Sequence, residues 1–202
     1  MPFLLRVELS DVPGSLGRLA GAIGEAGGDI EAIEIVEKRH DERIAVDDVL
    51  LEMEPGVMPD SVVSACNALD GVRVVWISRY AAGGNLFLDL EAVEQMTNNP
   101  HEAIDRLLGL LPITFRADWA ARVHRERGIV RATEAAPDEL AFTSIGRAVR
   151  IQTEDDNVHC GARLNDDEII LIGRRGGPEF LDAELARLGH LVGLAMSIAR
   201  AG

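Results

Sequence analysis

The chain has 202 residues, of which 47% are hydrophobic and 27% charged, as in ordinary globular proteins, and this length suits one large domain or two small ones. Its 34 acidic residues outnumber its 20 basic residues, which gives a net charge of −14. An acidic surface repels phosphate backbones and anionic lipids, and this argues against nucleic-acid binding and against a role at a membrane surface.

No basic segment followed by an apolar stretch opens the sequence, and it contains no run of about 18 apolar residues. We therefore expect a cytoplasmic protein. The two cysteines, Cys66 and Cys160, lie far apart and neither belongs to a CxxC pair, so we expect two free, buried thiols.

The first predicted element is a half-buried strand, in which apolar residues alternate with residues that face the other way, such as Arg6 and Glu8. The apolar residues are Phe3, Leu5, Val7 and Leu9. A helix is expected from about Ser15, because the next apolar residues recur at helical spacing. Between the two elements, Pro13 fixes φ and Gly14 allows a close approach to the backbone. The turn and the free amides of the helix N-terminus could together form a small ligand-binding cradle.

Three further strands and one helix are predicted in the first half of the chain. Gly27 and Gly28 end the first helix, and a second strand covers about residues 29–38. A third strand is expected to point Val49 and Leu51 to one face and Asp48 to the other. A helix around residues 62–69 and a strand over residues 72–80 complete a ferredoxin-like βαββαβ order, with helices on one sheet face only. Glutamates at positions 31, 34 and 37 are expected to lie on a solvated face.

Residues 3–80 resemble an ACT domain, a small regulatory module that binds amino acids in many metabolic enzymes. Two motifs carry the resemblance: the hexapeptide Asp11, Val12, Pro13, Gly14, Ser15, Leu16, and the tripeptide Gly28, Asp29, Ile30. The resemblance implies a ligand site at a dimer interface. It would be formed by Asp11 and Asp29, the amides of Val12, Gly14, Ser15 and Leu16, and Ile30. Many amino-acid-binding ACT domains have Asn at the position of Asp29. The alternative is that the turn serves geometry alone.

Residues 81–85 form the expected linker between a domain over residues 1–80 and a second domain over residues 86–202. The second domain begins with a helix over residues 88–97 and another that Asn99 caps and Pro100 opens. Five short strands are expected at about residues 119–125, 129–133, 148–152, 158–164 and 168–174. A final long helix follows Pro178, and its apolar stripe is Leu181, Leu185, Leu188, Val192, Ala195 and Ala199. The stripe could form a seam with a partner helix.

The second half resembles a GAF domain, a sensor module. The residues that carry the resemblance are 98–103 with the following helix, 118–121, and 173–180 followed by Asp182 and Glu184. The fold class is therefore expected to be α+β: an ACT domain plus a GAF-like α/β sandwich with a long C-terminal helix. Residues 131–150 are too few for the helices and loops that usually close a GAF pocket.

The sequence offers little catalytic chemistry. The five histidines have no partners at metal-site spacing except the adjacent His159 and Cys160, whose side chains would leave a strand on opposite faces. No nucleophile elbow, P-loop or dinucleotide fingerprint occurs. The glycine-rich segment with Arg174 and Arg175 could be an anion site or a solvated loop before the final helix. We therefore expect no enzyme activity, no metal and no cofactor.

The interpretation is a non-enzymatic sensor or regulatory protein that binds a small molecule, most naturally an amino acid, at an ACT homodimer interface. Any signal would pass to a protein partner, because the sequence shows no DNA-binding or catalytic output domain. A protein-interaction or assembly module with a vestigial pocket is the alternative, and an enzyme is the third hypothesis.

Overall fold

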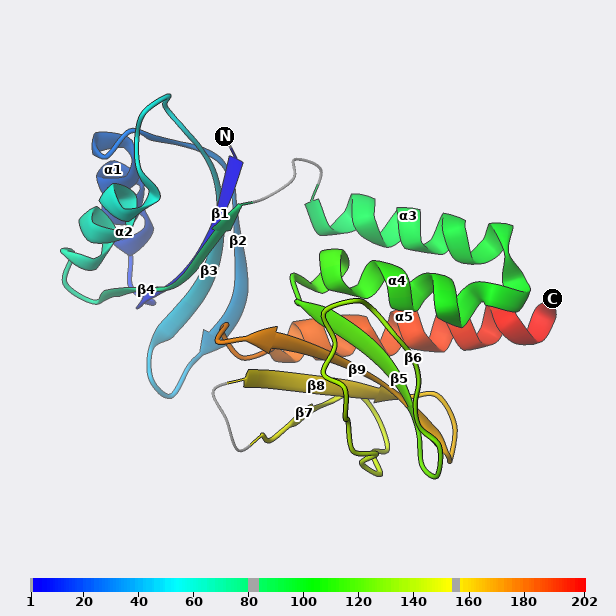
Figure 1. Cartoon of the computed structure of the whole chain (residues 1–202). Helices are drawn as coiled ribbons and strands as arrows, with labels where there is room; N and C mark the ends of the chain where they lie inside the picture. The colour runs from blue at the N-terminus through cyan, green and yellow to red at the C-terminus, as the bar shows by residue number, and fades with distance from the viewer. Residues whose placement is uncertain (1, 80–83, 154–156) are drawn as a thin grey trace. The chain divides into compact units, whose positions relative to one another are not determined.

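The computed structural model describes residues 2–79, 84–153 and 157–202, and the chain divides into two compact units, residues 1–82 and 83–202. Each unit combines helices with one antiparallel sheet, so the predicted α+β class is confirmed (Figure 1). Most of the predicted linker, residues 81–85, lies outside the described residues. Its last two residues, Gly84 and Asn85, already belong to a helix.

The first unit has the predicted ferredoxin-like order. Its elements are β1 (Pro2–Ser10), α1 (Ser15–Glu25), β2 (Gly28–Arg39), β3 (Ile44–Met53), α2 (Pro59–Asn67) and β4 (Val72–Arg79). The strands form an antiparallel sheet in the order β2-β3-β1-β4, with β2 and β4 at its edges. Both helices pack on one face, where Leu19, Ile23 and Val62 join the side chains of β1 and β3 in one apolar core. The helix begins at Ser15, as the apolar spacing predicted.

The prediction of a half-buried first strand is wrong, because β1 is buried on both faces. Arg6 is only 3% exposed and Asp48 only 5%, although both lie on the face away from the helices. The two residues are opposite each other in the β1–β3 pairing, and Arg6 donates Nε and Nη2 to the Asp48 carboxylate at 2.7 and 2.9 Å. A bidentate pair of this kind satisfies both charges, which allows their burial inside the sheet. Glu31 and Glu34 on the edge strand are exposed, as predicted, whereas Glu37 is half-buried and accepts a hydrogen bond from Arg39 Nε at 2.6 Å.

The second unit packs a layer of helices on one face of a five-stranded sheet (Figure 1). Its elements are α3 (Gly84–Asn98), a 3-10 turn (Pro100–Glu102), α4 (Ala103–Phe115), β5 (Trp119–His124), β6 (Gly128–Ala132), β7 (Val149–Ile151), β8 (Asn157–Arg163), β9 (Glu168–Arg175) and α5 (Asp182–Ala201). The strand order is β6-β5-β9-β8-β7, all antiparallel. Leu107, Leu111, Phe115, Ile172 and Leu188 are central to the core between the layers.

The other face of this sheet is closed by the chain itself. Trp119, Val123 and Leu171 lie under side chains of the irregular segment between β6 and β7, including Leu140 and Phe142. That segment contains no helix, in agreement with the prediction that it is too short to build a GAF-type pocket. Its apolar side chains instead pack on this face of the sheet.

The long final helix is confirmed, but it begins at Asp182 and not near Pro178. Leu185, Leu188, Val192 and Ala195 are buried in the core of their own unit, so this part of the stripe cannot form an exposed seam. In the parts of the chain that the structure describes, no helix is long and apolar enough to cross a membrane.

Candidate functional site

The turn from β1 into α1 is held in place by its neighbours in the first unit. Ser10 donates its amide to the Gly71 carbonyl at 3.0 Å, and Asp11 donates its amide to the Arg43 carbonyl at 2.8 Å. Gly14 precedes the helix with φ of 91°, in the left-handed region that glycine adopts at little cost. The turn residues Asp11, Pro13 and Gly14 remain exposed to solvent.

Of the four amides expected to meet a ligand carboxylate, the turn itself uses two. Val12 donates to the Ser10 carbonyl at 2.8 Å and Ser15 donates to the Val12 carbonyl at 3.2 Å. The amides of Gly14 and Leu16 have no acceptor among the residues that the structure describes. They lie at the N-terminus of α1, where the helix dipole favours an anion.

The Asp11 carboxylate lies beside a cation to which the sequence pattern assigns no function. Lys38 of β2, the only lysine in the sequence, places its Nζ atom 3.2 and 3.3 Å from the two carboxylate oxygens of Asp11. Both side chains are partly exposed, 41% for Lys38 and 36% for Asp11, so the pair can separate at small cost.

A second carboxylate, Asp47 of β3, lies on the helix-facing side of the same sheet. It is only 2% exposed, and its Oδ1 atom has no hydrogen-bond partner among the described residues. Burial raises the pKa of this carboxyl above its ordinary value; Lys38 lowers the pKa, whereas Asp11 and Asp48 raise it further. Asp47 was missed from the sequence, although a carboxylate within an otherwise apolar strand face was a usable signal.

Asp29 and Ile30 lie far from Asp11 within a single chain. Asp29 is opposite Glu52 at the start of β2, while Lys38, which binds Asp11, is near the end of that strand. Nine strand positions correspond to roughly 30 Å at about 3.3 Å per residue. Asp29 is exposed, and Ile30 is half-buried against the core of the unit. Only a second copy of the chain could bring an Asp29 to the Asp11 turn.

A cleft of about 510 Å³ adjoins the Asp11 turn. Ser10 and Val12, the two neighbours of Asp11, line it together with Arg43 and Arg73. The cleft therefore offers space next to the exposed turn within the first unit.

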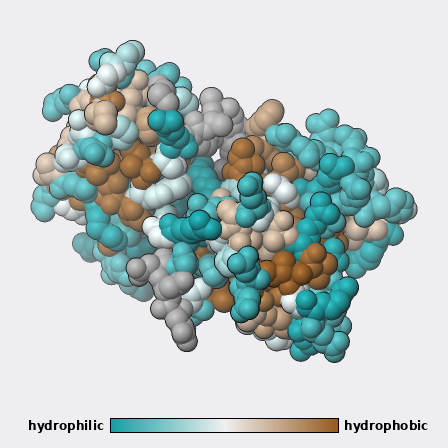
Figure 2. All heavy atoms as spheres, in the orientation of Figure 1, coloured by the Kyte–Doolittle hydropathy of each residue, from teal (hydrophilic) through white to brown (hydrophobic). Residues whose placement is uncertain are grey.

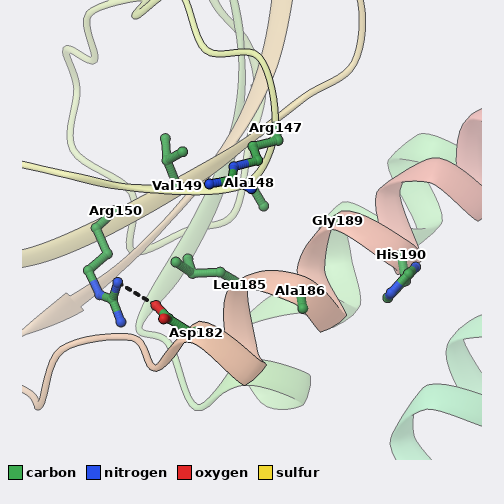
Figure 3. Close-up of a pocket in the computed structure, with 9 residues that line it drawn as sticks. All are labelled: Arg147, Ala148, Val149, Arg150, Asp182, Leu185, Ala186, Gly189 and His190. Carbon is green, nitrogen blue, oxygen red and sulfur yellow. Dashed lines mark hydrogen bonds and ion pairs between the residues drawn. The ribbon is translucent and has the colours of Figure 1, made fainter. Parts of the chain in front are cut away.

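A larger cleft, of about 720 Å³, lies in the second unit between α5 and residues 147–150 (Figure 3). Arg150 donates Nη1 to Asp182 at 2.7 Å across its rim, and Arg147 and His190 also line it. These four polar side chains are exposed or half-exposed. None of the buried, unpartnered polar atoms found in the described residues belongs to this cleft, so its polar groups need no ligand.

The suggestion that Arg174 belongs to an anion site or to a solvated loop is wrong. The residue lies in β9 and is 3% exposed. Its guanidinium donates to the carbonyls of Phe115 at 2.8 Å and Pro178 at 3.0 Å and to the Glu184 carboxylate at 2.6 Å. These acceptors use the donors that an anion would need.

The remaining chemistry is sparse in the described parts of the chain. They contain no group of three or more His, Cys, Asp and Glu side chains able to hold a metal ion. Cys66 and Cys160 are buried free thiols, as predicted. Burial raises the pKa of Cys66 to about 11 and also raises that of Cys160, so neither is an activated nucleophile at neutral pH.

Comparisons with known proteins add little. No protein-family model matches the sequence, and no curated protein matches it. Among solved structures, a formyltetrahydrofolate deformylase from Pseudomonas putida KT2440 has a TM-score of 0.32 and 7% identity to this chain. The match covers 49% of this chain and 39% of that enzyme, so the chain corresponds to well under half of that protein.

Proposed function

We propose that this protein is a non-enzymatic sensor that binds a free amino acid at the Asp11 turn of an ACT-like first unit. The observation that carries the proposal is the combination of an exposed carboxylate, Asp11, with two unused helix N-terminal amides, those of Gly14 and Leu16. A carboxylate suits an ammonium group and free amides suit a carboxylate, which are the two charged groups of every amino acid.

The proposal includes a homodimer that completes the site. Strand β2 is an edge of its sheet and exposes Ile35, which is 50% accessible, so it can pair with β2 of a second copy. Its pairing with β3 shifts register at two points, between Ile30 and Ala32 and between Ile35 and Glu37.

These two irregularities are equally far from the midpoint between Ile33 and Glu34. An antiparallel pairing about a twofold axis near that midpoint would bring the start of one β2 beside the end of the other. Such a pairing would bring the backbone of the partner subunit's Asp29 toward the end of β2 that carries Lys38.

Thermal unfolding with each of the twenty standard amino acids, followed by calorimetry on those that stabilise the protein, tests the proposal. We expect at least one to bind, and Asp11→Ala to weaken binding by about 1–3 kcal/mol, the usual range for a hydrogen bond to a charged group. Asp29→Asn should preserve or improve binding, because an amide both donates and accepts. Asp41→Ala, an exposed carboxylate of the β2–β3 turn, is the matched control.

The absence of stabilisation by every amino acid would refute the proposal. Light scattering at micromolar concentration tests the dimer separately. Ile35→Lys, which adds charge to the edge strand, should yield monomers, and a monomeric wild-type protein would exclude the shared site.

A protein-interaction module is the second candidate, and the helical layer of the second unit supports it. Phe87 and Leu90 of α3 are each 60% exposed, and Leu194 of α5 is 38% exposed. Apolar side chains also reach the visible surface of both units in patches between hydrophilic ones (Figure 2). Such side chains could receive the protein partner to which a sensor without its own output passes a signal.

A further inference from the structure

Asp11 of the turn is paired with Lys38 of β2, and Asp47 of β3 lies on the same, helix-facing side of the first sheet as Lys38. Lys38 pairs with Ala45 across the two strands, and Asp47 lies two residues further along the same face. Asp47 is thus a diagonal cross-strand neighbour of Lys38, within reach of long side chains. Both Lys38 and Asp11 act on the charge of Asp47.

Asp47 occupies a position where the sheet otherwise presents apolar side chains to the helices. Its neighbours on the same face of β3, Ala45 and Val49, belong to the apolar core, and Val7 is opposite it on β1. Buried polar atoms in folded proteins are nearly always hydrogen-bonded. The unpartnered Oδ1 of Asp47 therefore marks a place where a donor is missing.

We propose that a bound amino acid replaces the Asp11–Lys38 ion pair, with its ammonium group between Asp11 and Asp47 and its carboxylate on Lys38. The inference rests on the proposed amino-acid site and adds two specificity-determining residues, Lys38 and Asp47. The amides of Gly14 and Leu16 supply further donors to the same carboxylate.

Charge balance supports this exchange. Without ligand, the Lys38 ammonium group is paired with Asp11, and the Oδ1 atom of Asp47 has no donor among the described residues. A zwitterion brings one charge of each sign, so Lys38 gains a new counter-ion when it leaves Asp11, and Asp47 gains a donor. An amine without a carboxylate would leave Lys38 without a counter-ion, and an N-acylated acid would leave the Asp47 oxygen without a cationic donor. The site is therefore expected to select ligands in which both groups are free.

Two variants test the inference in the 202-residue protein by calorimetry. Lys38→Gln and Asp47→Asn are each expected to weaken the amino acid found by the thermal screen by roughly ten- to one-hundred-fold. Lys38→Arg should retain part of the affinity, and Asp41→Asn, which removes an exposed carboxylate, should retain all of it. The amide and the N-acetyl derivative of the same amino acid should each bind wild type at least tenfold more weakly.

The single lysine provides a direct probe of the exchange. Reductive methylation with ¹³C-formaldehyde labels Lys38 as the only side-chain amine, and its NMR resonance should shift when the amino acid is added and not when the N-acetyl-blocked amide is added. If Asp47→Asn does not fold, the affinity of Lys38→Gln and the shift of this resonance still test whether the amino acid displaces Lys38 from Asp11, because the Lys38 side chain is partly exposed and its replacement should not prevent folding.

Full affinity in both variants, together with loss of binding in Asp11→Ala, would overturn the inference and leave the proposed function in place. If no amino acid binds the wild-type protein, both fall together.

Discussion

Replacing Arg174 with Met should destabilise the second unit strongly. The guanidinium lies over the Phe180 ring at 3.9 Å and donates to the carbonyls of Phe115 and Pro178 and to Glu184. Met keeps much of the apolar stem but donates no hydrogen bond, so the Oε1 atom of the mostly buried Glu184 and two carbonyls lose the hydrogen bonds from Arg174. Breaking a buried pair by removing one partner costs about 3–5 kcal/mol, and we expect a loss in that range.

Urea unfolding followed by tryptophan fluorescence measures this loss in the correct unit. The chain has two tryptophans, Trp76 in β4 and Trp119 in β5, so Trp76→Phe leaves Trp119 as a reporter for the second unit. Arg106→Met is the matched control, because Arg106 forms an exposed pair with Glu102 and should cost less than about 1 kcal/mol. A change below about 1 kcal/mol for the Arg174 variant would refute the reasoning.

Three further outcomes follow from the structure. Because Cys66 and Cys160 are buried with raised pKa values, iodoacetamide at pH 8 should label neither thiol in the native protein and both in urea; rapid native labelling would contradict this. Gly14→Val should lower the free energy of unfolding by at least about 1–2 kcal/mol and abolish stabilisation by the amino acid. Because Asn tolerates a positive φ, Gly14→Asn should retain most of the folding stability and most of the stabilisation by the amino acid in thermal melts. Burial raises the pKa of Asp47 in the folded state, so its contribution to stability is fully present below its ordinary value of 3.8 and is lost as the pH rises through the folded pKa. Asp47→Asn should therefore gain stability relative to wild type as the pH rises from about 4 to 7 in urea titrations; an unchanged difference would contradict the assigned cause.

The fold could be predicted well from the sequence because the first unit repeats two simple periods. Alternating apolar residues gave β1, and the spacing of Leu19 and Ile23 gave α1 with its first residue correct. Burial of the second face of β1 could not be read from the same pattern. A charged residue such as Arg6 indicates solvent unless its partner is known, and its partner, Asp48, is 42 residues away.

The candidate site was predicted only in part, for a related reason. The residues of the Asp11 turn are consecutive, so the sequence alone identifies them as one motif. Lys38 and Asp47 reach the same place through strand pairing, which brings residues from two other strands beside a turn. The alternation of β3 places Asp47 on the apolar face and Asp48 on the other, but a single sequence does not specify the register that brings Lys38 and the Asp11 turn beside it.

The apolar stripe of the final helix suggested packing against a second molecule, but it packs against elements of its own unit. Its apolar residues recur at four-three spacing, which is equally compatible with a seam between two molecules and with a layer inside one. What decides between them is the amount of apolar surface elsewhere in the unit that needs cover. Here Leu188 and Val192 pack in the core with residues of α4 and of one face of the five-stranded sheet, and both are almost fully buried. A dimer of this protein would therefore use other surfaces, and the edge strand β2, whose Ile35 is 50% exposed, offers one of them.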